Sequence, residues 1–257
     1  MRTGLSAVAG AALEALYPPV CAACGAETAA QGGLCADCFA EAAFIAAPFC
    51  DLCGAPLAER APEAGERLVC EQCARWPPAW SRGRAAALYG GPIRKAALAL
   101  KHADRLDIAR TAAGWMQRAG RDLIAECDLV APVPLHWTRL LLRRFNQSAE
   151  LARHLTQRAG RPEAFAPDLL IRRRATPSQE GRGRAARIEN MAGAFALRAR
   201  RAPLARGARV LLVDDVITTG ATLSACAEAL RAAGAADVAV LALARVARDA
   251  EPHMTGA

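Results

Sequence analysis

Four Cys-x-x-Cys pairs in the first third of the chain constrain its fold more than any other feature. They use eight of the ten cysteines. A gap of two residues lets both thiolates of a pair bind one ion, and two pairs complete the tetrahedron that zinc prefers. We therefore predict two structural zinc sites with no open coordination position. The expected ligands are Cys21, Cys24, Cys35, Cys38, Cys50, Cys53, Cys70 and Cys73.

The placement of glycine favours zinc sites built from consecutive pairs. Gly25 and Gly54 each directly follow a pair, where glycine lets backbone amides turn toward the sulfurs. Along the chain, a pair followed by glycine precedes a pair without glycine, and this order occurs twice. The repeat favours one site from residues 21–38 and another from residues 50–73. Interleaved pairing and an iron–sulfur centre are the alternatives. A disulfide scaffold would need an oxidising compartment and redox catalysis normally uses a single pair, so both are disfavoured.

The start of the chain combines Arg2, an apolar run and small residues, as a signal peptide does. Glu14 within the run and the prolines at 18 and 19 favour instead a short amphipathic helix over residues 1–20. The run is shorter than the roughly 20 apolar residues that span a bilayer, so we expect no membrane span. A cytoplasmic location agrees with the many thiols.

Beyond the cysteines, the sequence alternates predicted strands and helices, and 53% hydrophobic residues suffice for a large core. This alternation implies a parallel sheet with flanking helices, which binds ligands beyond the carboxyl ends of its strands. The expected parts are a double zinc ribbon over 21–75, a linker and first strand over 76–88, an α/β domain over 89–248 and a flexible tail over 249–257. Further strands are expected at 128–133, 169–171, 209–216 and 237–246, and helices at 93–126 with an interruption at 101–104, 137–159 and 222–233.

Positive charge is concentrated in the middle of the chain. The formal net charge is +8, and between positions 139 and 187 there are twelve arginines against four acidic residues. Such a window suits a polyanion, such as a pyrophosphate, a nucleotide or a nucleic-acid backbone. A solvated arginine-rich surface is the alternative.

The segment from Val210 to Thr222 is the most informative about function. Its apolar strand ends in Asp214 and Asp215, a loop of small and hydroxyl residues follows, and a helix is expected to begin with Thr222 as its cap. Loop and helix amides can bind a phosphate, and Gly220 permits close approach. Adjacent carboxylates repel each other unless a metal or a ligand with hydroxyls satisfies them, so a ribose 5-phosphate fits. A generic turn with two solvated acids is the alternative.

This segment resembles the phosphoribosyl-diphosphate motif of type I phosphoribosyltransferases over its whole length. The resemblance implies that Asp214 and Asp215 bind the ribose 2- and 3-hydroxyls. It further implies that the 5-phosphate is bound by Thr218, Thr219, Gly220, Ala221 and Thr222.

Further segments resemble the ComF-type competence protein family over nearly the full chain, since its members also begin with cysteine pairs. The resemblance implies a type I phosphoribosyltransferase-like α/β fold, a parallel sheet with flanking helices, preceded by a small Cys-rich double zinc ribbon. Arg144 departs from the family pattern, which usually has glycine at this position. The departure concerns the backbone conformation of the turn before Phe145. The matching residues are Pro132-Val133-Pro134-Leu135-His136-Trp137, Arg139, Arg143-Arg144-Phe145-Asn146-Gln147, Gln179, Arg187, Asn190 and Gly193-Ala194-Phe195.

Two groups of basic residues are candidates for binding pyrophosphate. Lys101 lies where such proteins have a lysine ahead of a tight pyrophosphate loop, and it is one of two lysines in a chain with 31 arginines. Its compact ammonium suits that role, although a surface lysine on a helix is the alternative. Arg182, Arg184 and Arg187 lie in a glycine-containing loop, which is typical of a mobile cover and resembles the flexible loop of phosphoribosyltransferases.

As an enzyme, such a chain would displace pyrophosphate from ribose C1 with a nitrogen nucleophile, mainly through positioning and charge stabilisation. Asp214, Asp215 and Lys101 are the expected catalytic residues, and Mg²⁺ would bridge pyrophosphate and ribose oxygens. No segment indicates the acceptor. The alternative is a non-catalytic accessory protein that binds single-stranded DNA at the same basic site. The family resemblance implies a role in DNA uptake during natural transformation, with DNA-processing proteins as partners.

Overall fold

The computed structural model describes residues 18–29, 31–57, 66–102, 105–174, 191 and 193–247. Residues 1–17 of the N-terminal helix expected over residues 1–20, and the tail expected over 249–257, lie outside the described residues. Arg182, Arg184 and Arg187 also lie outside them. Within the described ranges, no helix is both long and apolar enough to cross a membrane.

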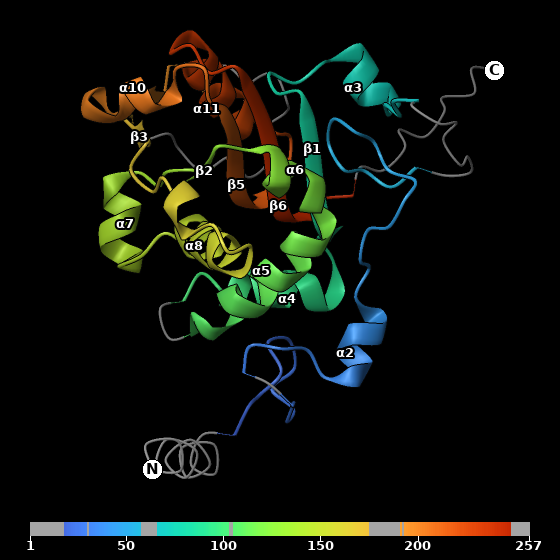
Figure 1. Ribbon diagram of the computed structural model, residues 1–257. Coiled ribbons are helices and arrows are strands. Elements are labelled where there is room, and N and C mark those ends of the chain that lie inside the picture. Colours follow the sequence, from blue (N-terminus) through green and yellow to red (C-terminus); the bar gives the residue numbers. More distant parts are fainter. Residues whose placement is uncertain are drawn as a thin grey trace, which may run out of the picture.

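A four-stranded parallel sheet with the order β1-β6-β5-β2 forms the centre of the larger part of the chain (Figure 1). The two central strands are buried over most of their length, as expected for parallel strands covered on both faces. The parallel sheet predicted from the alternation of strands and helices is therefore confirmed. Its strands are β1 (Arg82–Leu88), β2 (Leu129–Pro132), β5 (Arg209–Ile217) and β6 (Asp237–Arg245).

Helices cover both faces of this sheet and close two hydrophobic cores. Alternate residues of β5 point to opposite faces, so Leu211 and Val213 belong to one core and Val210 and Leu212 to the other. The first core is covered by α4 (Gly91–Ala99), α5 (Asp107–Ala119), α6 (Arg121–Glu126) and α8 (Gln147–Arg158). The second is covered by α11 (Ala221–Ala232), with α10 (Ala202–Ala205) and the short 3₁₀ helix Ala199–Arg201 beside it. Another 3₁₀ turn, Pro162–Ala164, follows α8.

The cysteine-rich segment repeats one local pattern twice. In the first copy an isolated bridge joins Val20 and Glu27, and α2 (Ala36–Glu41) begins after Cys35. In the second copy a bridge joins Phe49 and Pro56, and α3 (Glu71–Arg75) begins after Cys70. Each copy therefore carries one cysteine pair in a bridged turn and the other at the start of a short helix.

The strand expected at 169–171 forms, but it does not join the main sheet. It is β3 (Leu170–Arg172), which pairs antiparallel with β4 (Phe195–Leu197) in a separate two-stranded sheet. The free edge of β2 is taken instead by Phe165, which forms a parallel bridge with Val130. The described neighbour of β2 at that edge is therefore Phe165 and not β3.

Two helix predictions are wrong in detail. The helix expected over 137–159 is split into α7 (Trp137–Arg143) and α8, because Arg144 is left-handed, with a φ of +65°. Asn146 then caps α8, since its side-chain oxygen accepts a hydrogen bond from the Ser148 amide. The helix expected to begin with Thr222 as its cap begins instead at Ala221, with left-handed Gly220 at the cap position.

Candidate functional site

Asp214 and Asp215 lie at the carboxyl end of the sheet, as the sequence predicts. The last residue of β2 pairs with Val213, so both acids extend past the end of β2, while β6 continues beside them. A backbone amide binds each carboxylate: the Asp215 amide donates to Asp214 Oδ1 at 2.9 Å, and the Val216 amide donates to Asp215 Oδ1 at 2.8 Å. Because these bonds are local, the strand itself fixes the side-chain directions.

Residues distant in sequence converge on these two acids. Ser148 Oγ donates to Asp214 Oδ1 at 2.9 Å, and Gln147 Nε2 lies 3.5 Å from Asp215 Oδ2. Lys101 Nζ lies 3.7 Å from the same Asp215 oxygen. The structure therefore brings Lys101 and both acids together, as expected for one site. Ser148 was missed by the sequence analysis, although its neighbour Gln147 belongs to the family motif.

The two carboxylates differ in environment. Burial, followed by the negative charge of Asp215, raises the pKa of Asp214 to about 8. Hydrogen bonds from Ser148 and from the Asp215 amide act in the opposite direction but do not cancel this effect. Near neutral pH the Asp214 carboxyl is therefore largely protonated, and a cation or a ligand with hydroxyl groups would favour its ionisation.

The backbone conformation and the surroundings of residue 220, in the turn between β5 and α11, both require glycine. Gly220 has a φ of +80°, and an added Cβ would lie 2.8 Å from Cη2 of Trp80. Thr218 is exposed and Thr219 is half-buried, so their hydroxyls lie at or near the surface. The hydroxyl of Thr222, expected to bind phosphate, lies 3.8 Å from Met191 Sδ instead of capping the helix.

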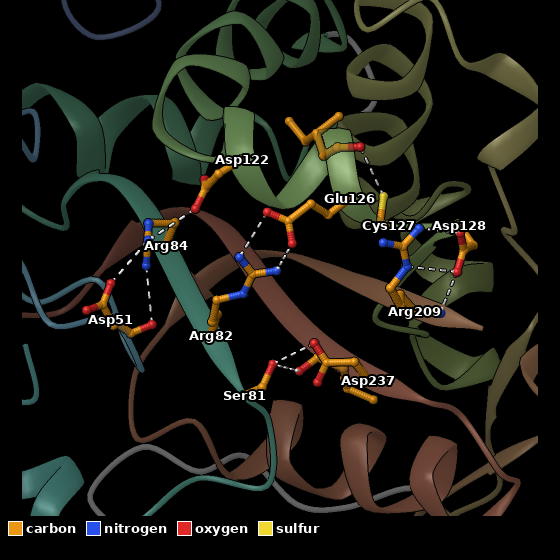
Figure 2. Close-up of polar contacts among 12 residues, drawn as sticks. Asp51, Ser81, Arg82, Arg84, Asp122, Glu126, Cys127, Asp128, Arg209 and Asp237 are labelled. Carbon is orange, nitrogen blue, oxygen red and sulfur yellow. Dashed lines mark hydrogen bonds and ion pairs between the residues drawn. The ribbon is translucent and has the colours of Figure 1, made fainter. Parts of the chain in front are cut away.

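The opposite end of the sheet carries several ion pairs and hydrogen bonds (Figure 2). Hydrogen bonds from Arg209 lower the pKa of Asp128 to about 2, which is a structural effect at the amino end of β5. Since ligands of parallel sheets bind at the carboxyl ends, these pairs hold the strands and helices together. The polar pairs at this end are Arg82 with Glu126, Arg84 with Asp51 and Asp122, Ser81 with Asp237, and Arg209 with Asp128.

The eight paired cysteines form two clusters in which all four sulfurs lie within 4.8 Å of one another. This confirms the consecutive pairing and contradicts the interleaved one. The first cluster contains Cys21, Cys24, Cys35 and Cys38, and the second contains Cys50, Cys53, Cys70 and Cys73.

The surroundings of the second cluster fit a zinc–thiolate centre. Four thiolates around Zn²⁺ leave a net negative charge, and the buried guanidinium of Arg245 donates to the Cys53 carbonyl oxygen at 2.5 Å. Arg245 Nη2 is also buried and has no hydrogen-bond partner among the described residues. A hydrogen bond to Cys50 lowers the pKa of Cys53 to about 6, and the charge of Arg245 acts in the same direction. Such a thiolate is the form that binds metal.

Comparisons with known proteins agree with both parts of this architecture. A family model described as a double zinc ribbon domain matches residues 12–74, and one described as a phosphoribosyl transferase domain matches residues 146–257. Together with the two cysteine clusters, the first match supports two structural zinc sites. A solved allosteric regulatory enzyme of purine biosynthesis aligns with a TM-score of 0.37 at 24% identity, over 57% of this chain and 30% of that chain.

Two curated relatives match over most of their length. Competence protein F of Haemophilus influenzae is 30% identical, over 84% of this chain and 92% of its own. DNA utilization protein YhgH of Salmonella typhimurium is 33% identical, over 83% of this chain and 90% of its own. The chain therefore belongs to the ComF-type competence protein family and joins a double zinc ribbon to a phosphoribosyltransferase-like α/β fold.

Proposed function

We propose that this chain binds phosphoribosyl diphosphate, or a related sugar phosphate, together with Mg²⁺ and acts in DNA uptake. The observation that carries the proposal is the convergence of Asp214, Asp215 and Lys101 beside the Gly220 turn at the carboxyl end of β5. The names of the relatives, a competence protein and a DNA utilization protein, support the biological role. A cytoplasmic location is part of the proposal, because thiolate sites persist in a reducing compartment.

Each part of the site has a proposed role. Asp214 and Asp215 hold the ribose hydroxyls, and residues 218–222 hold the 5-phosphate through backbone amides and hydroxyls. Ser148 and Gln147 keep the two carboxylates in position. Mg²⁺, bound mainly by ligand oxygens, would neutralise part of the pyrophosphate charge.

Lys101 is the proposed partner of the pyrophosphate. Its side chain is 29% exposed and only 3.7 Å from Asp215, so it offsets that negative charge and can still turn toward a ligand. Arg182, Arg184 and Arg187 are proposed to cover the pyrophosphate. Catalysis, if the chain turns over, would consist of pyrophosphate departure from ribose C1 as a nitrogen nucleophile attacks, with these cations stabilising the leaving group.

Calorimetry of the zinc-loaded chain with phosphoribosyl diphosphate and Mg²⁺ tests this proposal. Asp215→Asn should weaken binding at least about tenfold, because a hydrogen bond to a charged group contributes about 1.5–3 kcal/mol. Asp128→Asn is the matched control: it also removes a carboxylate from an ion pair, but at the other end of the sheet, and should leave affinity unchanged. Equal affinities for Asp215→Asn and wild type would reject the site. A pyrophosphate-release screen with a panel of nucleobases then tests turnover.

A second candidate function, binding of single-stranded DNA, is favoured by a cavity of about 890 Å³ between the first ribbon and two helices. Arg110 and Arg118 from α5 and Arg153 and Arg158 from α8 line it. Guanidinium groups around one cavity suit a phosphodiester backbone. Gln31 of the ribbon completes one wall, with its carbonyl oxygen accepting from Thr111 Oγ1.

Charge reversal separates the two functions. The double variant Arg118→Glu/Arg158→Glu should weaken single-stranded DNA binding and reduce its salt dependence by about two ion contacts, while sugar-phosphate affinity stays unchanged. An unchanged salt slope would show that DNA, if bound, lies elsewhere. A steep slope with no saturable binding of phosphoribosyl diphosphate would favour the accessory role over the enzyme.

A further inference from the structure

The second cysteine cluster contacts the α/β part of the chain through backbone carbonyls of its first turn. Trp80 Nε1 donates to the Leu52 carbonyl oxygen, and Arg245 Nη1 donates to that of Cys53, each at 2.5 Å. Both side chains are buried, with Trp80 5% and Arg245 1% exposed. These two hydrogen bonds therefore join the metal-binding turn to the interior of the α/β part.

The side chain of Trp80 and the backbone at Arg245 also reach the turn proposed to bind phosphate. The ring of Trp80 lies against Gly220, close enough to leave no room for a Cβ. Arg245 is the last residue of β6 and pairs in register with Ile217, the last residue of β5. The next amide, that of Val246, donates to the Ile217 carbonyl oxygen at 2.9 Å. The Trp80 ring thus lies at one end of the segment 217–220, and the backbone at Arg245 and Val246 pairs with the other end.

The metal-binding turn has little freedom to move relative to the sheet. The Gly83 amide of β1 donates to the Asp51 carbonyl oxygen at 2.8 Å, and a Cβ on Gly83 would collide with the Leu52 carbonyl oxygen. Arg84 reaches across from β1 to the Asp51 side chain, as Figure 2 shows. A change in the position of the Cys50–Cys53 turn must therefore also move β1 and Trp80.

The first cluster provides a natural contrast. Its described contacts with the α/β part include α4 and α5. The helix α2, which carries Cys38, lies against α4. Thr111 Oγ1 donates to the Gln31 carbonyl oxygen, and Gly32 lies against the Asp107 backbone. Neither of these two contacts involves residues 217–222. The two clusters are alike in ligands but differ in what they touch.

We propose that metal binding at the second cluster positions the sugar-phosphate turn, with Trp80 as the positioning residue. Zinc bound by Cys50 and Cys53 fixes the Leu52 carbonyl oxygen, which holds the indole of Trp80 against Gly220. Arg245 provides a parallel connection and balances the negative charge of the thiolates. The ligand in this inference rests on the proposed function, whereas the coupling between cluster and turn does not.

The physical basis is that bonds between zinc and the cysteines order the segment around the second cluster, which has little hydrophobic core of its own. Among the described residues, the apolar side chains packed against the cysteines of the second cluster are Leu52, Ala55 and Leu57. Metal binding in such small segments is coupled to folding, so loss of zinc releases the carbonyls that hold Trp80 and Arg245. Loss of a group that orients a metal ligand typically lowers the affinity for the metal by about 10–100-fold. We expect that loss of the metal lowers the affinity of the turn for its ligand by a comparable factor.

Matched cysteine variants of the full chain test the coupling. Cys73→Ser and Cys38→Ser each remove one buried ligand, supplied by the short helix of its own repeat. In Cys73→Ser, hydrogen exchange of the amides at 217–222 should accelerate about tenfold and affinity for phosphoribosyl diphosphate should fall by a similar factor. In Cys38→Ser, both should stay within about twofold of wild type. Equal exchange at 217–222 in the two variants would overturn the proposal.

Trp80→Phe tests the positioning role without removing a metal ligand. Exchange at 217–222 should accelerate while the chain keeps two zinc ions, because only the hydrogen bond to Leu52 and part of the ring are lost. This variant also decides the matter should Cys73→Ser fail to fold. Unchanged exchange in Trp80→Phe would refute the role of Trp80. If wild type binds no phosphoribosyl diphosphate, the proposed function fails, while the exchange comparison still tests the coupling.

Discussion

Replacing Gly220 by alanine should destabilise the chain through two separate costs. The φ of +80° at Gly220 is left-handed, which costs an L-residue about 1–2 kcal/mol. The new Cβ would lie 2.8 Å from Cη2 of Trp80, which is 5% exposed and enclosed by core residues. Overpacking of this kind costs about 1–3 kcal/mol. The two costs together lower the free energy of unfolding by about 2–5 kcal/mol.

Gly160→Ala separates these costs. Gly160 has a similar φ of +70°, but nothing lies within 4 Å of its Cβ position, so only the backbone cost of about 1–2 kcal/mol applies. Urea unfolding of the zinc-loaded chain, followed by far-ultraviolet circular dichroism, measures both variants. Trp80→Phe should recover part of the loss in Gly220→Ala, which a double-mutant cycle detects. Equal losses for Gly220→Ala and Gly160→Ala would refute the contact between Trp80 and the turn.

Three further predictions concern other parts of the chain. Arg144→Gly should raise the free energy of unfolding by about 0.5–1 kcal/mol. The reason is that relief of backbone strain at a φ of +65° exceeds the cost of the greater conformational entropy that glycine loses on folding. A lower melting temperature for Arg144→Gly would contradict this. The pKa of Asp214 is about 8 in the folded chain against an ordinary 3.8, so the folded state binds the extra proton and stability falls as pH rises between these values. Asp214→Asn should flatten that fall in urea unfolding at pH 5 and pH 8, and an unchanged slope would refute it. Arg245→Met should accelerate zinc loss from the second cluster to a chelator but not from the first, because a buried compensating charge is removed; equal release from both would count against it.

Features fixed by local sequence were predictable. The two-residue gap within each cysteine pair dictates that both sulfurs face one ion, and both clusters form as expected. The continuous apolar run before Asp214 predicts a buried strand, and β5 covers the expected residues plus Ile217. The glycine expected before Phe145 in the family motif marks a left-handed position, and Arg144 adopts that conformation despite its side chain.

Features that depend on distant residues were not predictable. Threonine is a common helix cap, which favoured Thr222, but Trp80 occupies the space beside residue 220, and only glycine fits there. Helical spacing runs across Arg144 without interruption, and it gives no sign that Asn146 will donate a hydrogen bond to the distant Val133 carbonyl oxygen. The role of Ser148 beside Asp214 likewise requires α8 to pack against β5, which no local pattern encodes.

A crystal structure of the chain soaked with phosphoribosyl diphosphate and Mg²⁺ tests the central claim most directly. The account predicts the 5-phosphate within hydrogen-bonding distance of the backbone at residues 218–222, and the ribose hydroxyls on the carboxylates of Asp214 and Asp215. A ligand bound only in the arginine-lined cavity between α5 and α8, or no ligand at the carboxyl end of β5, would contradict it.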